Sequence, residues 1–162
     1  MIRILKSLLI MFVGLQALFY GLQNIANLEI AQAFVGGTLS LTGHESYPET
    51  MFFAITSPAL HAVILWFIIA CELAIGLLGI KGGWDLFAAR NANPAAFQAA
   101  KRYGIASAGL ALFLWFGLFM GVGGAFFQMW QTPAGIAALQ GAFMYAMSSA
   151  IVLLFVCHTP DD

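Results

Sequence analysis

The stretch from Ser57 to Ile80 constrains this chain most, because it is an apolar run of about 23 residues. An α-helix of that length, rising about 1.5 Å per residue, crosses a bilayer core of about 30 Å. Ser57 and Pro58 favour a helix start, since an N-cap hydroxyl and a first-turn proline suit the unpaired N–H groups there. Inside the run lie His61 and Glu72, two polar groups that are costly to place in lipid. The stretch therefore predicts a membrane-spanning helix that carries buried polar groups.

The composition supports a membrane protein over the whole chain. Of its 162 residues 62% are hydrophobic and 8% are charged, whereas soluble domains average about 25% charged residues. The length fits a single membrane domain, residues 1–162. A net charge of −1 without a basic run argues against nucleic acid as a partner, because nucleic-acid binding needs clustered lysine and arginine. Cys71 and Cys157 lie far apart in apolar segments, so no dithiol motif or zinc site is indicated.

Hydropathy divides the chain into four predicted spans, which make it an all-α integral membrane four-helix bundle. The first apolar run has no small-residue cleavage site close behind it and reads as an uncleaved span. A short connection at 128–132 makes the third and fourth spans antiparallel neighbours. The spans cover about residues 4–22, 58–80, 103–127 and 133–157.

The segment 23–57 between the first two spans is the longest polar part of the chain. Apolar residues at helical spacing from Asn27 to Val35, followed by two glycines, predict a short interfacial helix. Loop-forming and acidic residues come next, and the following residues return along the membrane surface to the second span. The loop contains Gly43, Glu45, Pro48 and Glu49, and the return contains Thr50, Met51, Phe52, Phe53 and Ile55.

All six basic residues of the chain fall on one side of this four-span arrangement. Positive charges mark the cytoplasmic loops of membrane proteins. Both termini and the loop 81–102 are therefore predicted to be cytoplasmic, and the segment 23–57 faces outward. The basic residues are Arg3, Lys6, Lys81, Arg90, Lys101 and Arg102.

The buried polar groups sort by depth into two predicted clusters. His61 lies about three turns before Glu72, on the same helix face and nearer the outside. Counting depth along straight helices gives an outer cluster of Tyr20, Gln23, His61 and Gln140. The inner cluster contains Gln16, Glu72, Ser148 and Ser149. A carboxylate inside a membrane indicates a ligand- or proton-binding site, whereas amides and hydroxyls there also serve as contacts between helices.

Small residues at helical spacing predict where helices pack closely. Gly76, one turn after Glu72, lets a neighbouring helix approach its face. The pairs Gly117/Gly121 and Ala142/Ala146 indicate two further packing faces.

Cofactor chemistry finds little support in the sequence. His61 is the histidine that falls clearly inside a span, and His44 approaches only from the outer loop. A glycine-rich phosphate loop, a nucleophile elbow and a metal-ligand spacing are all missing from the sequence. We therefore expect no cofactor, no metal and no enzymatic activity.

Three segments resemble an uncharacterised bacterial family of predicted small integral membrane proteins. They are YGLQN at 20–24, ITSPALH with the following Trp66 and Glu72, and GGAFFQMWQ at 123–131. The resemblance implies a four-span fold in the bacterial inner membrane and assigns no activity. After Gln131 the chain has Thr132-Pro133-Ala134-Gly135, where the family pattern leads us to expect a Trp-Asn-Gly-Gln-like stretch. The resemblance also marks Tyr20, Asn24, Ser57, Pro58, His61, Trp66, Glu72, Gly123, Gly124, Trp130 and Gln131.

Two classes of function follow from these observations. One is an accessory or assembly subunit that packs against other membrane proteins, or against a second copy, within the bilayer. The alternative is a small proton-coupled transporter or ligand-binding membrane protein that uses Glu72 and His61. The sequence favours the first, because one acid and one histidine are few parts for a coupled cycle and no inverted repeat is visible.

Overall fold

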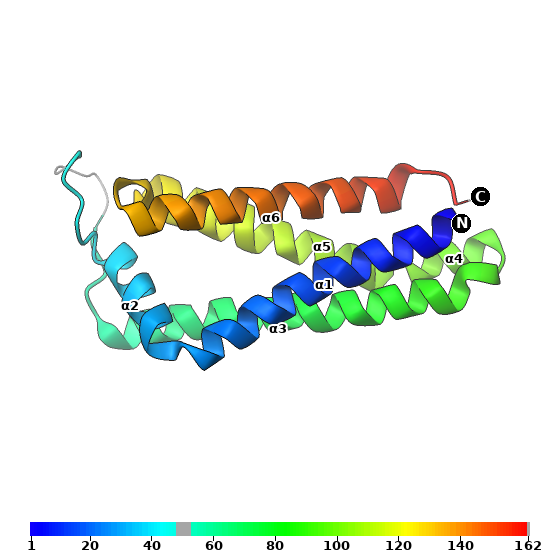
Figure 1. Ribbon diagram of the computed structural model, residues 1–162, viewed down its shortest axis with the longest axis horizontal. Coiled ribbons are helices and arrows are strands. Elements are labelled where there is room, and N and C mark those ends of the chain that lie inside the picture. The colour runs from blue at the N-terminus through cyan, green and yellow to red at the C-terminus, as the bar shows by residue number, and fades with distance from the viewer. Residues whose placement is uncertain (48–52, 162) are drawn as a thin grey trace.

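The computed structural model describes residues 1–47 and 53–161, and in that part the chain is all-α. Four long apolar helices lie along a common axis (Figure 1). Each is long and apolar enough to cross a membrane, so the predicted all-α, four-helix architecture is confirmed. The helices are α1 (Ile2–Ala26), α3 (Pro58–Ala88), α5 (Arg102–Leu112) with its continuation η2 (Phe113–Phe126), and α6 (Pro133–His158).

Three of the described helices begin at a proline. Pro58, Pro94 and Pro133 each occupy the first turn of a helix, where a missing N–H costs nothing because that group has no intrahelical partner. The Thr132 hydroxyl accepts a hydrogen bond from the Gly135 N–H at 3.0 Å and so caps α6. This capping turn fixes where the last helix turns back into the bundle.

The third long helix changes its winding midway. From Phe113 to Phe126 the helix is a π-helix, and the bond from the Phe127 N–H to the Val122 carbonyl, 2.9 Å, has the i→i+5 pattern of that winding. Gln128 then adopts a left-handed conformation with φ 49°, which ends the helix before η3 (Met129–Gln131) and α6. The π-helical half forms one wall of the cavities described below.

The predicted short helix after the first span is present as α2 (Leu28–Leu39). It runs past the expected stop at Gly36 and Gly37, because Gly36 packs against the ring of His61 and a Cβ there would lie 2.9 Å from the ring Nδ1. The predicted loop at Pro48 and Glu49, and the return through Thr50, Met51 and Phe52, lie outside the described residues.

The connection between the second and third spans holds more helix than the expected loop 81–102. α3 continues to Ala88 and is followed by η1 (Ala89–Asn91) and α4 (Pro94–Ala100). Gly82 and Gly83 do not end the helix, because both are contact points: Gly82 touches the backbone of Gly104, and a Cβ on Gly83 would lie 3.0 Å from Met11 Cβ. They let α1 and α5 approach α3 closely.

α1 and α3 pack closely against each other through small residues. A Cβ on Gly79 would lie 2.5 Å from the Cα of Gly14, and one on Gly76 would lie 2.8 Å from Leu18 Cβ. Gly76 therefore occupies a close-packing position of the kind expected. Small residues of this sort allow backbones to approach within van der Waals distance in membranes.

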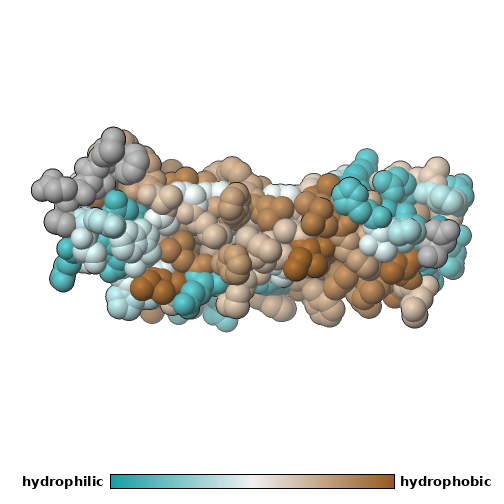
Figure 2. All heavy atoms as spheres, turned by 90° about the horizontal axis from the view of Figure 1, so that it is seen from above, coloured by the Kyte–Doolittle hydropathy of each residue, from teal (hydrophilic) through white to brown (hydrophobic). Residues whose placement is uncertain are grey.

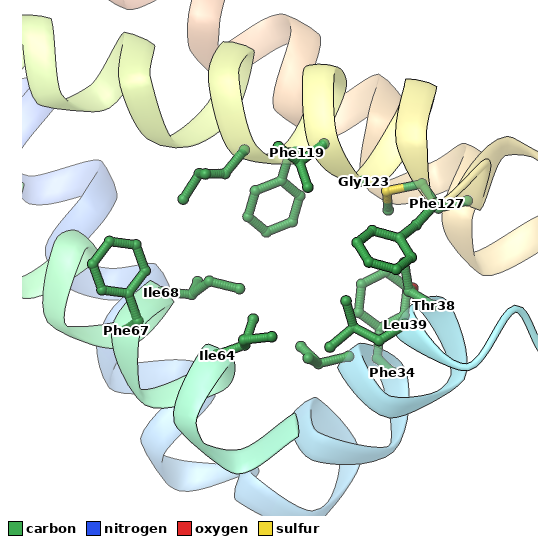
Figure 3. Close-up of a pocket in the computed structure, with 13 residues that line it drawn as sticks. Phe34, Thr38, Leu39, Ile64, Phe67, Ile68, Phe119, Gly123 and Phe127 are labelled. Carbon is green, nitrogen blue, oxygen red and sulfur yellow. The ribbon is translucent and has the colours of Figure 1, made fainter. Parts of the chain in front are cut away.

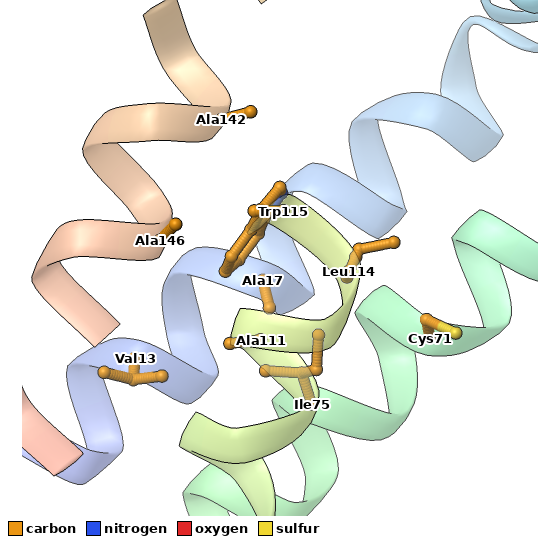
Figure 4. Close-up of a cluster of buried hydrophobic side chains, with 9 residues drawn as sticks. All are labelled: Val13, Ala17, Cys71, Ile75, Ala111, Leu114, Trp115, Ala142 and Ala146. Carbon is orange, nitrogen blue, oxygen red and sulfur yellow. The ribbon is translucent and has the colours of Figure 1, made fainter. Parts of the chain in front are cut away.

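Ala142 and Ala146 also lie in the core, where α6 meets α1 and the third helix (Figure 4). The Gly117/Gly121 pair does not pack against another of the described helices. Atoms within 4 Å of a Cβ placed on either glycine belong only to their own helix, at Phe113 and Phe116. Their face points away from the other three helices, so the expected packing there is not made within one chain.

Both termini and α4 lie at the same end of the bundle (Figure 1). On the face shown in Figure 2, hydrophobic side chains cover the middle and hydrophilic ones gather toward the two ends. At the end with the termini, Asp161 accepts hydrogen bonds from the ammonium groups of Lys6 at 2.5 Å and Lys101 at 2.8 Å. We call these three residues the terminal ion cluster.

The terminal ion cluster is a buried arrangement of paired charges. Lys6 and Lys101 are 0% and 2% exposed. Burial by itself raises the pKa of Asp161, but the hydrogen bonds and positive charges of Lys101 and Lys6 outweigh it and hold that pKa below its usual value. Arg3 strengthens the same end, since its guanidinium donates to the backbone carbonyls of Asp161 at 2.9 Å and Ala92 at 2.6 Å.

Candidate functional site

Glu72 lies near the middle of α3 and is 3% exposed. It faces α1 because it shares a helix face with Gly76 and Gly79, the residues that bring α1 close. A Cβ on Gly21 of α1 would lie 3.2 Å from the Glu72 Cβ. From the same helix, the Asn24 side-chain amide donates a hydrogen bond of 2.8 Å to Glu72 Oε2. The carboxyl group is thus held from one side by a neutral donor.

The other side of Glu72 borders a cavity of about 210 Å³. Residues of α1, α2, α3, the π-helical segment and α6 line it. Within residues 1–47 and 53–161, Glu72 forms no ion pair and Oε1 accepts no hydrogen bond. Among the described residues, one oxygen of the carboxyl group is thus left without a protein partner beside this cavity.

Five aromatic side chains form part of the wall of this cavity. The Tyr20 and Tyr145 hydroxyls hydrogen-bond to each other, and their rings lie 4.8 Å apart between centroids. Trp115 meets Tyr145 edge-on at 5.3 Å. Phe34 and Phe119 also line the cavity, together with small and aliphatic residues of α2, α3 and α6. Aromatic faces attract cations through the ring quadrupole. A carboxylate attracts cations through its negative charge. We call Glu72, Asn24, Tyr20, Trp115 and Tyr145, with their shared cavity, the Glu72 site.

The structure brings together only part of the predicted inner cluster. Ser149 is fully buried, but its hydroxyl has no hydrogen-bond partner among the described residues. Ser148 is exposed and donates to the Tyr145 carbonyl at 3.1 Å, and Gln16 is half-buried outside the cavity lining. Tyr145 of α6, and not the two serines, lines the Glu72 cavity. The rotation of α6 is set by Ala142 and Ala146, the α6 residues through which it packs into the core.

The predicted outer cluster is not assembled either. Gln23 and Gln140 are exposed, and His61 is held elsewhere. The His61 Nε2–H donates to the Ile55 carbonyl at 2.7 Å, and the Ser40 hydroxyl donates to the same carbonyl at 3.1 Å. Because α2 turns back directly after α1, Gly36 of α2 lies against His61 where Gln23 was expected. His61 thus fastens the chain before α3 and does not line the Glu72 cavity.

His44 also lies apart from Glu72. It lines a separate cavity of about 200 Å³ near Thr42 and Thr132, and burial lowers the pKa of its ring. Its Nε2 is buried without a hydrogen-bond partner in the described part of the chain. In that part of the chain, no three histidine, cysteine, aspartate or glutamate side chains lie close enough together to hold a metal ion.

The sequence-based clusters left out three members of the Glu72 site, Asn24, Trp115 and Tyr145, although the family resemblance marks Asn24. Asn24 follows Tyr20 by one helical turn, so the two share a face, and this spacing could have identified it. Tyr145 lies one turn before Ser149 on α6, so its helical spacing from a predicted cluster member was a usable signal. Trp115 carries no signal of its own, since it lies within an apolar run.

Four long apolar helices around a buried, unpaired carboxyl group define a multi-pass integral membrane protein with an internal polar site. The chain belongs to the family described as "Predicted small integral membrane protein (DUF2165)", whose model matches residues 2–159. This finding confirms the resemblance seen in the three sequence segments. Neither the curated proteins nor the solved structures include a match to the chain.

Proposed function

We propose that this protein is a ligand-binding membrane protein that holds a small organic cation at the Glu72 site. The observation that carries the proposal is a carboxyl group, 3% exposed, with one neutral hydrogen-bond donor and an aromatic-lined cavity beside it. This is the second of the two functions drawn from the sequence. It uses Glu72 as expected, but His61 is engaged in holding the chain before α3.

The electrostatics of the site favour a cation over an anion or a neutral guest. An ionised carboxylate in the middle of a membrane costs about 2.5–3.5 kcal/mol on insertion scales, and a positive charge beside it offsets that cost. The rings of Tyr20, Trp115 and Tyr145 add a quadrupole attraction of roughly 0.5–2 kcal/mol per favourable contact. Asn24 donates its N–H to one carboxylate oxygen and leaves the second oxygen to the guest.

The test is binding of propyltrimethylammonium to the purified protein in lipid nanodiscs, measured by titration calorimetry. We expect saturable binding above that of empty nanodiscs. Glu72→Gln should weaken it by at least about tenfold, equivalent to about 1.4 kcal/mol. Glu29→Gln is the matched control, because Glu29 is an exposed carboxylate on α2 outside the cavity lining. Equal binding by the wild type and Glu72→Gln would refute the proposal.

Transport would extend this function. A carboxylate that binds either a proton or an organic cation couples the two, because one site does not hold both charges at once. In proteoliposomes, a proton gradient should drive accumulation of the same probe by the wild type and not by Glu72→Gln. If the probe binds but the proton gradient drives no uptake, the protein binds the cation without transporting it, and proton-coupled transport is ruled out.

A role as an accessory or assembly subunit is the second candidate. The observation that favours it is the face of the third helix at Gly109, Gly117 and Gly121, where a Cβ would meet no atom of another helix. Helices that associate in membranes use such faces. Purification in a mild detergent followed by mass spectrometry tests this role. A stoichiometric partner lost in Gly117→Leu but retained in Glu72→Gln would support it.

For the orientation, we propose that both termini and α4 lie in the cytoplasm of a bacterial cell, with the protein in the inner membrane. The positive-inside rule supports this, since Arg3, Lys6, Arg90 and Lys101 lie around the end that holds the termini. Labelling of a single cysteine introduced at Ala92 or at Tyr47 in intact cells tests it. Cys157 is exposed, so the background must first carry Cys157→Ser and Cys71→Ser. We expect a membrane-impermeant reagent to reach position 47 only.

A further inference from the structure

A second, apolar cavity of about 240 Å³ lies between α2, α3 and the π-helical segment (Figure 3). Its walls include Phe34, Ile64, Phe67 and Phe127, and Thr38 is the single hydroxyl-bearing side chain among its lining residues. Water gains little in such a place, because it needs two to four polar partners to be stable in a cavity. The cavity therefore suits an apolar occupant.

The apolar cavity and the Glu72 site share a wall. Phe34 and Val35 of α2, Ile68 of α3 and Phe119 of η2 line both cavities. A ligand group in one cavity thus contacts side chains that also line the other cavity. Between them the two cavities offer a carboxylate with aromatic faces at one end and an almost wholly apolar space at the other.

From this adjacency we propose that the ligand of the Glu72 site is a single-chain cationic amphiphile. Its ammonium head group lies against Glu72 and the rings of Trp115 and Tyr145, and its hydrocarbon tail lies in the apolar cavity. The inference rests on the proposed function, because it specifies the chemistry of the same ligand. It adds the tail, for which the apolar cavity provides the place.

The charge of the site distinguishes this ligand from an ordinary zwitterionic lipid. A phosphocholine or phosphoethanolamine head group carries a phosphate close to its ammonium group, which would bring a second negative charge toward Glu72. Among the described residues that line the Glu72 cavity none is a lysine, an arginine or a histidine, so nothing there would neutralise a phosphate. The site therefore favours an alkylammonium over a phospholipid.

The test compares decyltrimethylammonium with propyltrimethylammonium on the full-length protein in nanodiscs, with partition into empty nanodiscs subtracted. We expect the long probe to bind about tenfold more tightly or better, since each further buried methylene favours binding, although competition from the lipid removes part of this gain. Decylphosphocholine, with the same tail, should bind at least about tenfold more weakly than decyltrimethylammonium.

Ile64→Trp fills the apolar cavity and should remove the advantage of the long probe while leaving the affinity for the short probe within about twofold. Val63→Trp is the matched control, because Val63 is exposed on the same helix and lines neither cavity. If Ile64→Trp does not fold, Leu118→Phe narrows the same cavity from the opposite wall.

The outcomes separate the two proposals. Equal affinity of the wild type for the long and short probes, or an undiminished preference in Ile64→Trp, overturns the amphiphile and leaves the cation site standing. Tight binding of decylphosphocholine also overturns it, in favour of a zwitterionic lipid. Failure of both ammonium probes to bind overturns the proposed function itself, and the inference with it.

Discussion

The two lysines of the terminal ion cluster and the carboxyl group of Glu72 are buried to a similar extent but have different partners. Lys6 and Lys101 are 0% and 2% exposed, and Glu72 is 3% exposed. Both lysines share the Asp161 carboxylate at 2.5 and 2.8 Å. Glu72 has a neutral amide at 2.8 Å and a cavity. The chain thus compensates buried charge within its own fold at the end that holds the termini, and among the described residues it does not do so at Glu72.

This difference separates a structural role from a binding role. Breaking a buried ion pair typically costs about 3–5 kcal/mol, because the remaining charge is left without compensation. Neutralising a buried charge that has no counter-charge breaks no ion pair, so it should not lower the free energy of unfolding in this way. The terminal ion cluster should therefore hold the bundle together, whereas the Glu72 site should tolerate the loss of its charge and lose ligand instead.

The largest effect should follow from Asp161→Asn. Both lysines then lose their counter-charge, and we expect the free energy of unfolding to fall by about 3 kcal/mol, the lower end of the range for buried pairs because Asp161 is partly exposed. Thermal unfolding of the purified protein would show this as a drop of about 6–12 °C in Tm. Asp85→Asn is the control, since it breaks only the exposed Lys81–Asp85 pair. A change in Asp161→Asn no larger than in this control would contradict the comparison.

Acidification should reproduce that loss gradually. The pKa of Asp161 is lowered from its ordinary value of 3.8, so the unfolded chain binds the proton more readily than the folded one. The stabilisation is therefore complete above about pH 5 and is lost as the pH falls below 4 and through the folded-state pKa. Tm measured against pH should show the wild type and Asp161→Asn converging in acid. Parallel curves down to pH 3 would argue against the ion pairs.

A smaller loss should follow from Asn24→Leu, which removes the donor to Glu72. Hydrogen bonds to charged groups contribute about 1.5–3 kcal/mol, so we expect a loss of about 1.5 kcal/mol in chemical denaturation. In a Glu72→Leu background the same substitution should cost less than about 0.5 kcal/mol, because no polar partner remains. Equal losses in the two backgrounds would show that Asn24 acts independently of Glu72.

The smallest effect should come from Glu72→Gln. A glutamine oxygen still accepts the Asn24 hydrogen bond while the uncompensated charge is gone, so stability should stay within about 0.5 kcal/mol of the wild type or rise. Thermal unfolding in detergent, run beside Asp161→Asn, provides the measurement. A loss as large as that of Asp161→Asn would make Glu72 a structural residue and remove the contrast between the two regions.

The sequence was sufficient for the architecture because lipid demands long apolar helices, and runs such as 58–80 and 133–157 satisfy that demand only as spans. Glu72 could be identified for the same reason, since a carboxyl group in an apolar run is conspicuous. The partners of Glu72 could not be identified in this way. Depth along a straight helix follows from the sequence, but the rotation of each helix about its axis does not.

Rotation is decided by contacts that depend on exact spacing. Gly76, Gly79 and Gly83 follow Glu72 on one helix face, and the closeness of Gly14 to Gly79 turns that face toward α1. This face selects Asn24 over the neighbouring Gln23. The glycine spacing was legible in the sequence, but the π-helical winding that positions Trp115 and Phe119 has no such signature.

Asp161 also bears on how the protein is made. Lys6 is synthesised early and Lys101 later, yet within the described residues the carboxylate that pairs with both belongs to a residue that follows the last helix. Until the ribosome has passed that point, two lysines destined for burial have no counter-charge and remain better solvated at the membrane surface. Closure of this end of the bundle thus requires the segment that follows α6 to be in place.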